Sequence, residues 1–171
     1  MSSTRVAVYA GTHWIVGLLN TENRRLNEVA NDRASEFFSL TEARVHTEPD
    51  LSQALTMLPR MVIPKLAVTL IASLEERHEA PDKRRTYMQR KQAFPVFITV
   101  AGSEVMGHLH LSARMDPVAL LARLTTDGAA FFAVSDAEVV QLPILGGTDL
   151  APVVLIARQA VTGCYLADVP V

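Results

Sequence analysis

The feature that most constrains this chain is a segment that occurs twice. Residues 37–45 read FFSLTEARV and residues 131–139 read FFAVSDAEV. Two aromatic residues, an aliphatic residue, a hydroxyl, an acid, alanine and valine therefore recur in the same order without a gap. A match of this length and order predicts that two parts of the chain share one local structure.

The repeat extends on both sides of this segment. Three further blocks match: residues 8–12 with 99–103, Gly17 with Gly107, and residues 63–69 with 156–162. These blocks keep their order and nearly their spacing, whereas a solenoid would show a shorter period repeated more often. We therefore predict an internal duplication, with a first β repeat at residues 1–76, a charged linker at 77–93 and a second β repeat at 94–171.

Each repeat is predicted to be a β-β-α-β-β unit followed by short strands, which makes the fold mainly β with short helices (α+β). Short β-branched runs end at glycine, as expected for strands joined by tight turns. Separate strands are expected before and after the hydroxyl–acid pairs at residues 41–42 and 135–136, which indicate turns or bulges. The last block of each repeat predicts two short strands, which divide near Lys65 and Arg158.

A short helix is expected after the second strand of each repeat. Asp116 followed by proline is typical of a capping residue and the first helical position. The corresponding helix of the first repeat is expected at residues 23–30, with Thr21 or Asn23 as its cap. Residues 49–58 are an insertion in the first repeat, where Asp50 could cap another short helix.

The strands are short and glycine interrupts two of them, as in a strongly bent sheet or small barrel. Gly17 and Gly107 are interpreted as sites of bending or close backbone approach. Two arrangements remain open: one small barrel in each repeat, or a single pseudo-two-fold β-barrel or sandwich to which both repeats contribute.

This pattern resembles the Sm-like, SH3-type small β-barrel, present as two tandem copies. The resemblance rests on Gly-x-Leu at Gly17 and Gly107 and on the basic residues Lys65 and Arg158 between the last two strands. It implies ring assembly through edge strands and, in that family, binding of single-stranded RNA. The chain departs from the family where leucine and glutamine, instead of glycine, follow the basic residues, and where the helix follows the second strand.

Candidate catalytic and metal-binding residues are few, and no catalytic, cofactor or metal site is predicted. His108 and His110 alternate on one strand and could form half of a metal site, with Glu104 or Asp116 as a third ligand. Cys164 lies in a strand-like run and is interpreted as a core residue. The repeated acids Glu42 and Asp136 are expected to bind local backbone amides rather than to act as an acid–base pair. The Gly146-Gly147 pair lacks the lysine of a phosphate loop.

The basic part of the linker is the best candidate for binding a polyanion. Clustered positive charge attracts phosphates and an aromatic ring can stack on a base. The residues are Lys83, Arg84, Arg85, Tyr87, Arg90 and Lys91. Acidic residues nearby, among them Glu75 and Asp82, balance this positive charge, so the alternative is a solvated loop that binds no polyanion.

Composition restricts the function further. The net charge of −2 disfavours a general binder of nucleic acid or anionic membranes, and a hydrophobic content of 49 % is ample for a core. The single cysteine predicts a reducing compartment, and no signal peptide or membrane span is expected, so we expect a cytoplasmic protein. We expect a non-enzymatic assembly or scaffolding protein that forms a homo-oligomer or binds a protein partner. The alternatives are a single-stranded nucleic-acid-binding module and a small-ligand binder or enzyme with a site between the repeats.

Overall fold

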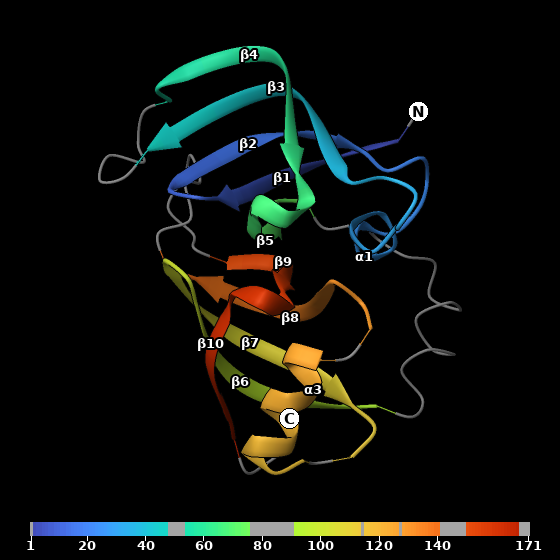
Figure 1. Ribbon diagram of the computed structural model, residues 1–171, viewed down its shortest axis with the longest axis vertical. Helices are drawn as coiled ribbons and strands as arrows, with labels where there is room; N and C mark the ends of the chain where they lie inside the picture. The colour runs from blue at the N-terminus through green and yellow to red at the C-terminus, as the bar shows by residue number, and fades with distance from the viewer. Residues whose placement is uncertain are drawn as a thin grey trace.

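A computed structural model describes residues 2–47, 54–75, 91–113, 115–126, 128–140 and 150–167. These residues form ten strands in one antiparallel sheet, two α-helices and two short 3₁₀ helices (Figure 1). The first half contains β1 (Ser3–Ala10), β2 (His13–Asn20), α1 (Leu26–Ala30), β3 (Phe37–Thr47), β4 (Thr56–Pro64), η1 (Lys65–Ala67) and β5 (Val68–Ser73). The second half contains β6 (Gln92–Val100), β7 (Ser103–Leu111), α3 (Pro117–Thr126), β8 (Phe131–Val139), β9 (Leu150–Ala157), η2 (Arg158–Ala160) and β10 (Val161–Leu166). The predicted mainly β architecture is confirmed.

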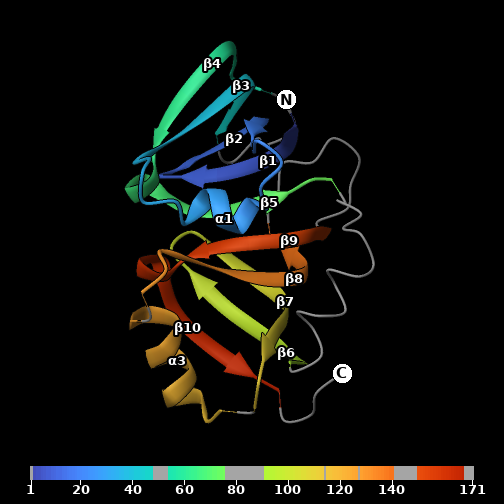
Figure 2. The ribbon, with the colours of Figure 1, turned by 90° about the vertical axis from the view of Figure 1, so that its right-hand side faces the viewer.

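The strand order is β10-β6-β7-β8-β9-β5-β1-β2-β3-β4, so each half supplies five neighbouring strands. The two halves meet where β5 pairs with β9, with Leu70 opposite Ile156 and Ile71 opposite Leu155. Figure 2 shows the halves stacked along the long axis of the molecule. The sheet formed by the described residues is open, with β10 at one end and β4 at the other, so the predicted closure into a barrel is not confirmed.

The third and fourth strands expected in each repeat form one continuous strand that contains a bulge. Glu42 and Asp136 adopt φ values of 51° and 46°, and the pairing register with the neighbouring strand shifts beside each of them. Gly17 and Gly107 face these bulges. A Cβ on them would lie 2.9 Å and 2.8 Å, respectively, from the carbonyl oxygen of the residue before each acid. Both glycines therefore permit the close approach that the bulge requires.

The helix of the second half begins as the sequence predicts. The carboxylate of Asp116 accepts hydrogen bonds from the backbone N–H groups of Val118 (3.0 Å) and Ala119 (3.1 Å). Two free N–H groups of the first helical turn are thereby satisfied. The last block of each half forms the two expected strands, β4 and β5 or β9 and β10, and the short helices η1 and η2, which the sequence did not predict, separate them.

The helix of the first half differs from the prediction at its start. Glu22 and Asn23 adopt φ values of 50° and 63°, which belong to a turn, and α1 begins only at Leu26. The carboxylate of Glu28 accepts the backbone N–H of Arg25 at 3.0 Å, so neither Thr21 nor Asn23 is the cap. In the insertion, residues 56–58 begin β4 instead of extending a helix, and residues 48–53 lie outside the described residues.

Two hydrophobic clusters form the core, and each contains residues of both halves. The cluster of the second half includes Tyr9, Trp14 and Leu70 from the first half. The cluster of the first half includes Phe131 and Leu155 from the second half. The sequence left open whether the halves share a core, and these clusters are shared.

Candidate functional site

The strands β4 and β10 lie at the two ends of the sheet. No described strand pairs with the outer side of β4 or of β10, and we call these sides the open edges. Seven of the nine residues of β4 are exposed, whereas β9 is largely buried. An open edge presents backbone N–H and C=O groups that can pair with a strand of another chain.

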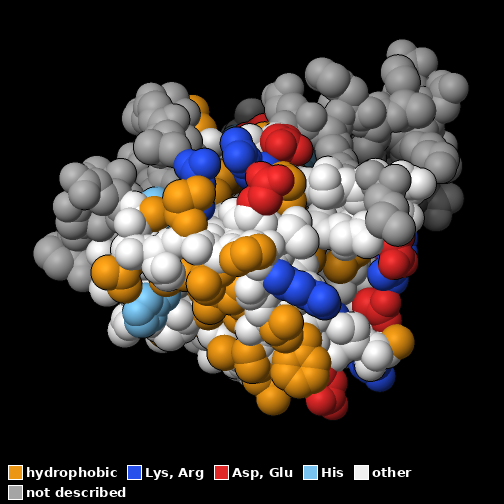
Figure 3. Space-filling view, turned by 90° about the horizontal axis from the view of Figure 1, so that it is seen from above, with side chains coloured by type: hydrophobic (Ala, Val, Ile, Leu, Met, Phe, Trp, Pro, Cys, Tyr) orange, Lys and Arg blue, Asp and Glu red, His pale blue; other side chains and the backbone are white. Residues whose placement is uncertain are grey.

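The open edge at β4 also carries exposed hydrophobic side chains. We call these residues the β4 apolar patch: Phe37 (51 % exposed), Leu55 (72 %), Met57 (66 %), Leu58 (37 %) and Val62 (52 %). Figure 3 views the molecule from this end and shows hydrophobic side chains gathered there around a basic side chain. Exposed apolar side chains that form a contiguous group are typical of an interaction surface.

The open edge at β10 is smaller and less apolar. Tyr165 is 61 % exposed, and the Thr162 hydroxyl donates a hydrogen bond to the Thr99 carbonyl oxygen at 3.0 Å. Cys164 is partly buried and packs against the core of the second half, so it lies at the margin of the core and not within it. Burial raises the pKa of the Cys164 thiol. The thiolate that a nucleophile needs is therefore disfavoured.

Lys65 and Arg158, the basic residues of the Sm-like resemblance, bind backbone carbonyls within the chain. The ammonium of Lys65 donates to the carbonyl oxygens of Val29 (3.0 Å) and Asp32 (2.7 Å), at the end of α1. It lies 5.1 Å from the centre of the Phe38 ring. Burial lowers the pKa of Lys65. Its ammonium therefore binds one carbonyl of the last turn of α1 and one just beyond the end of that helix.

Arg158 has the corresponding position at the end of α3. Its guanidinium donates to the carbonyl oxygens of Arg123 (2.7 Å) and Leu124 (2.8 Å), and also to that of Ala129. It lies 5.4 Å from the centre of the Phe132 ring. These contacts favour a structural role for both basic residues.

Truncation of these residues should therefore affect stability. We expect Arg158→Ala to lower the free energy of unfolding by about 2–3 kcal/mol, because the hydrogen bonds from a charged donor to backbone carbonyls are lost. Urea denaturation followed by circular dichroism measures this change. Arg60→Ala is the control, because Arg60 makes one exposed hydrogen bond, to the Ser39 hydroxyl, and its loss should cost at most about 0.5 kcal/mol. Equal stability of the Arg158→Ala variant and the wild type would contradict this role.

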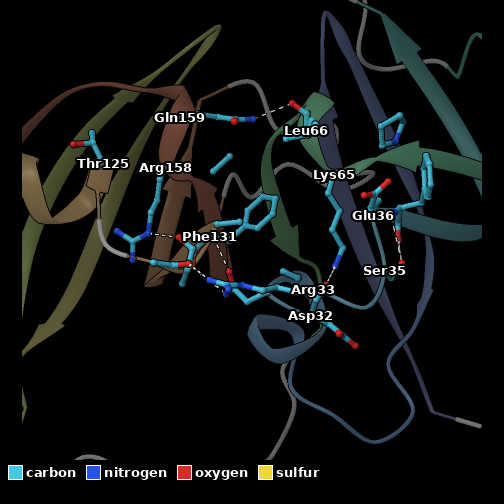
Figure 4. Close-up of a pocket in the computed structure, with 18 of the residues that line it drawn as sticks. Asp32, Arg33, Ser35, Glu36, Lys65, Leu66, Thr125, Phe131, Arg158 and Gln159 are labelled. Atoms are coloured by element: carbon cyan, nitrogen blue, oxygen red, sulfur yellow. Dashed lines mark hydrogen bonds between the residues drawn. The ribbon is translucent and has the colours of Figure 1, made fainter.

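A cleft of about 1020 Å³ lies between the halves, where residues 30–33, 35–37 and η1 face residues 125–126, 128–131 and η2. Figure 4 shows that side chains from both halves point into it. Several of its polar groups join the halves. The Asn31 side chain pairs with the backbone of Phe131 through two hydrogen bonds (2.8 and 3.1 Å), and Arg33 donates to the Gly128 carbonyl oxygen at 3.0 Å. The Gln159 amide donates to the Leu66 carbonyl oxygen at 2.9 Å.

The two histidines of the predicted half-site do lie on one face of β7. The His110 Nε2 atom is 2.8 Å from the Ser135 hydroxyl, and the His108 Nδ1 atom is 3.9 Å from the Asp136 carboxylate. Burial lowers the pKa of His110, which favours a neutral imidazole. Among the described residues, no three His, Cys, Asp or Glu side chains come together in a way that could hold a metal ion.

The repeated acids do not form a pair. Glu42 lies on β3 and Asp136 on β8, and the sheet order places β9, β5, β1 and β2 between these strands. Each acid adopts the left-handed conformation of its bulge. The two carboxylates therefore cannot act together on one substrate.

Of the predicted polyanion-binding residues, Lys83, Arg84, Arg85, Tyr87 and Arg90 lie outside the described residues. Lys91 is exposed and immediately precedes β6. Among the described helices, none is long and apolar enough to cross a membrane.

The sequence did not reveal the β4 apolar patch, because a covered strand and a strand at an open edge have similar apolar sequences. Comparison of the chain with protein-family models, with curated proteins and with solved structures gave no match.

Proposed function

We propose that this chain is a non-enzymatic assembly protein, built from a duplicated small β domain, that binds other protein chains through the open edges of its sheet. The observation that carries the proposal is the combination of an unpaired strand edge with the β4 apolar patch at one end of the sheet. Backbone pairing provides affinity in such contacts, and the apolar side chains provide buried area.

Three features support the duplication. The order β5-β1-β2-β3-β4 of the first half recurs as β10-β6-β7-β8-β9 in the second. Both halves have a glycine facing a bulge with a positive-φ acid. Both have a basic residue, Lys65 or Arg158, that binds carbonyls at the end of the helix and lies over a phenylalanine ring.

The glycines and basic residues on which the resemblance to Sm-like barrels rests have matching positions in both halves. RNA binding by the basic residues is supported less well, because Lys65 and Arg158 are bound to backbone carbonyls. Assembly through sheet edges is therefore the part of the resemblance that we carry into the proposal.

Light scattering on a sizing column tests the proposal. We expect a discrete multimer of 18.7 kDa units with an absorbance ratio at 260 and 280 nm typical of protein. Val62→Lys should shift the mass to that of one chain, because edge pairing would bury the new charge.

Met106→Lys is the matched control. Met106 is also an exposed hydrophobic residue (42 %), but it lies on β7 inside the sheet, so the multimer should persist. A wild-type protein that elutes as a single chain at all accessible concentrations would refute assembly. A high absorbance ratio that falls after a high-salt wash would favour the nucleic-acid alternative.

A further inference from the structure

We propose that the partner of the open edge at β4 is the open edge at β10 of a second copy, paired in the register of the β5–β9 junction within the chain. This inference rests on the proposed function, because it names the partner and geometry of the same edges. The contact is head-to-tail, between β4 of one copy and β10 of the next, and does not join two β4 strands.

The first argument is the position of the strands. β5 and β10 each follow a 3₁₀ helix and pair with the first strand of their own half, β1 or β6. β4 and β9 each precede a 3₁₀ helix and pair with the bulged strand of their half, β3 or β8. The two strand types that already pair inside the chain, as β5 with β9, are therefore the same two types that remain open at its ends, as β10 and β4.

The second argument compares the burial of matched residues on β9 and β4. Aligning Lys65 with Arg158 places Val62 at the position of Leu155. Leu155 is fully buried at the β5–β9 junction, which we call the inner junction, whereas Val62 is 52 % exposed. An apolar side chain therefore stands at the open end of the sheet where its counterpart is covered by a neighbouring unit.

Phe37 and Phe131 show the same contrast. They are the first residues of the repeated segment, and Phe131 is 3 % exposed whereas Phe37 is 51 % exposed. Phe131 packs into the core of the other half, with its ring 6.1 Å from that of Phe38 in an edge-on arrangement. The equivalent contact between copies would place Phe37 of one chain beside Phe132 of the next.

Residues of β10 are also more exposed than their counterparts on β5. Ala72 of β5 is fully buried beside β9, whereas its counterpart Tyr165 is 61 % exposed. Ile71 is fully buried, whereas its counterpart Cys164 is only partly buried. Both sides of the proposed contact are therefore incompletely covered in a single chain.

The β5–β9 junction within the chain also predicts the register of the β10–β4 contact between copies. Ile71 is opposite Leu155 and Ala72 is opposite Val154. Transferring these pairs through the alignment places Cys164 opposite Val62 and Tyr165 opposite Met61. Each contact uses the β4 edge of one copy and the β10 edge of the other, so a pair of copies still has one open edge of each type for further neighbours. Such heterologous contacts produce a closed ring or a filament.

Disulfide cross-linking tests this register directly in the full chain. The sequence contains one cysteine, so Val62→Cys provides a single partner for Cys164. Opposed residues of antiparallel strands have Cα atoms about 4.5–5.5 Å apart, which is within the range of a disulfide. After mild oxidation of the multimer, we expect a non-reducing gel to show a ladder of dimers, trimers and larger species, because every copy carries one cysteine at each end.

Two controls define the contact. The double variant Val62→Cys/Cys164→Ser should give no ladder. Met57→Cys, an exposed position (66 %) five residues away on the opposite face of β4, should also give no ladder.

The outcomes separate this inference from the proposed function. A dimer that persists in the double variant would show that two β4 strands pair, and would refute the head-to-tail contact while assembly stands. A multimer by light scattering that gives no cross-link in the Val62→Cys variant would refute the register. A single-chain mass for the wild type would refute both.

Discussion

Phe131→Ala should lower the free energy of unfolding by about 3–5 kcal/mol, which is the range for truncating a buried phenylalanine. Phe131 begins β8 in the second half, but its side chain is 3 % exposed in the hydrophobic cluster of the first half. Its backbone is also held by the Asn31 side chain. Loss of the ring would therefore leave a cavity at the contact between the halves. Urea denaturation, monitored by circular dichroism, measures the change.

Phe37→Ala is the matched control, because Phe37 has the same place in the repeated sequence. Its side chain is 51 % exposed, so at a dilution where the wild type is a single chain its truncation should cost at most about 0.5 kcal/mol. At higher concentration the same variant should associate more weakly, because its ring would lie in the contact between copies. Similar destabilisation by both substitutions would contradict the distinction between an inner and an open junction.

The two halves, produced separately as residues 1–80 and 90–171, should each fail to unfold cooperatively. Each half would expose a strand that is now internal, β5 or β9. Each would also lose core partners, because the cluster of the second half contains Tyr9 and Trp14 and that of the first half contains Leu155. Mixing the two halves should restore a cooperative transition, since the missing contacts are all non-covalent.

Tryptophan fluorescence provides the measurement. Trp14 is the only tryptophan of the chain and is 1 % exposed. Its emission should be that of a solvated indole in the first half alone and should shift to shorter wavelength when the second half is added. A buried tryptophan and a cooperative thermal transition in the isolated first half would show that the halves fold independently.

Local structure followed from the sequence where neighbouring residues determine it. The Asp116-Pro117 pair predicted the start of α3, because a carboxylate before the first turn satisfies free N–H groups. The hydroxyl–acid pairs were predicted as turns or bulges and the two glycines as sites of bending or close backbone approach, and only the fold shows that they face each other. The start of α1 was predicted less well, since the turn at Glu22 and Asn23 has no distinctive sequence signal.

The candidate site depended on contacts between distant residues and was therefore hidden. Lys65 and Arg158 were interpreted as a family motif, and only the fold places them against the carbonyls that end α1 and α3. The β4 apolar patch was hidden for a similar reason. An apolar strand has the same appearance in the sequence whether a neighbouring strand covers it, as for β9, or not, as for β4.

By itself, the sequence predicted the mainly β architecture, a turn or bulge at each hydroxyl–acid pair and the helix of the second half, because these depend on residues close together in the chain. Only the tertiary structure decided that the sheet joins β5 to β9, that the halves share two cores and that β4 and β10 remain open. Strand order depends on which edges bury the most apolar surface together, and that choice is made between segments far apart in the sequence.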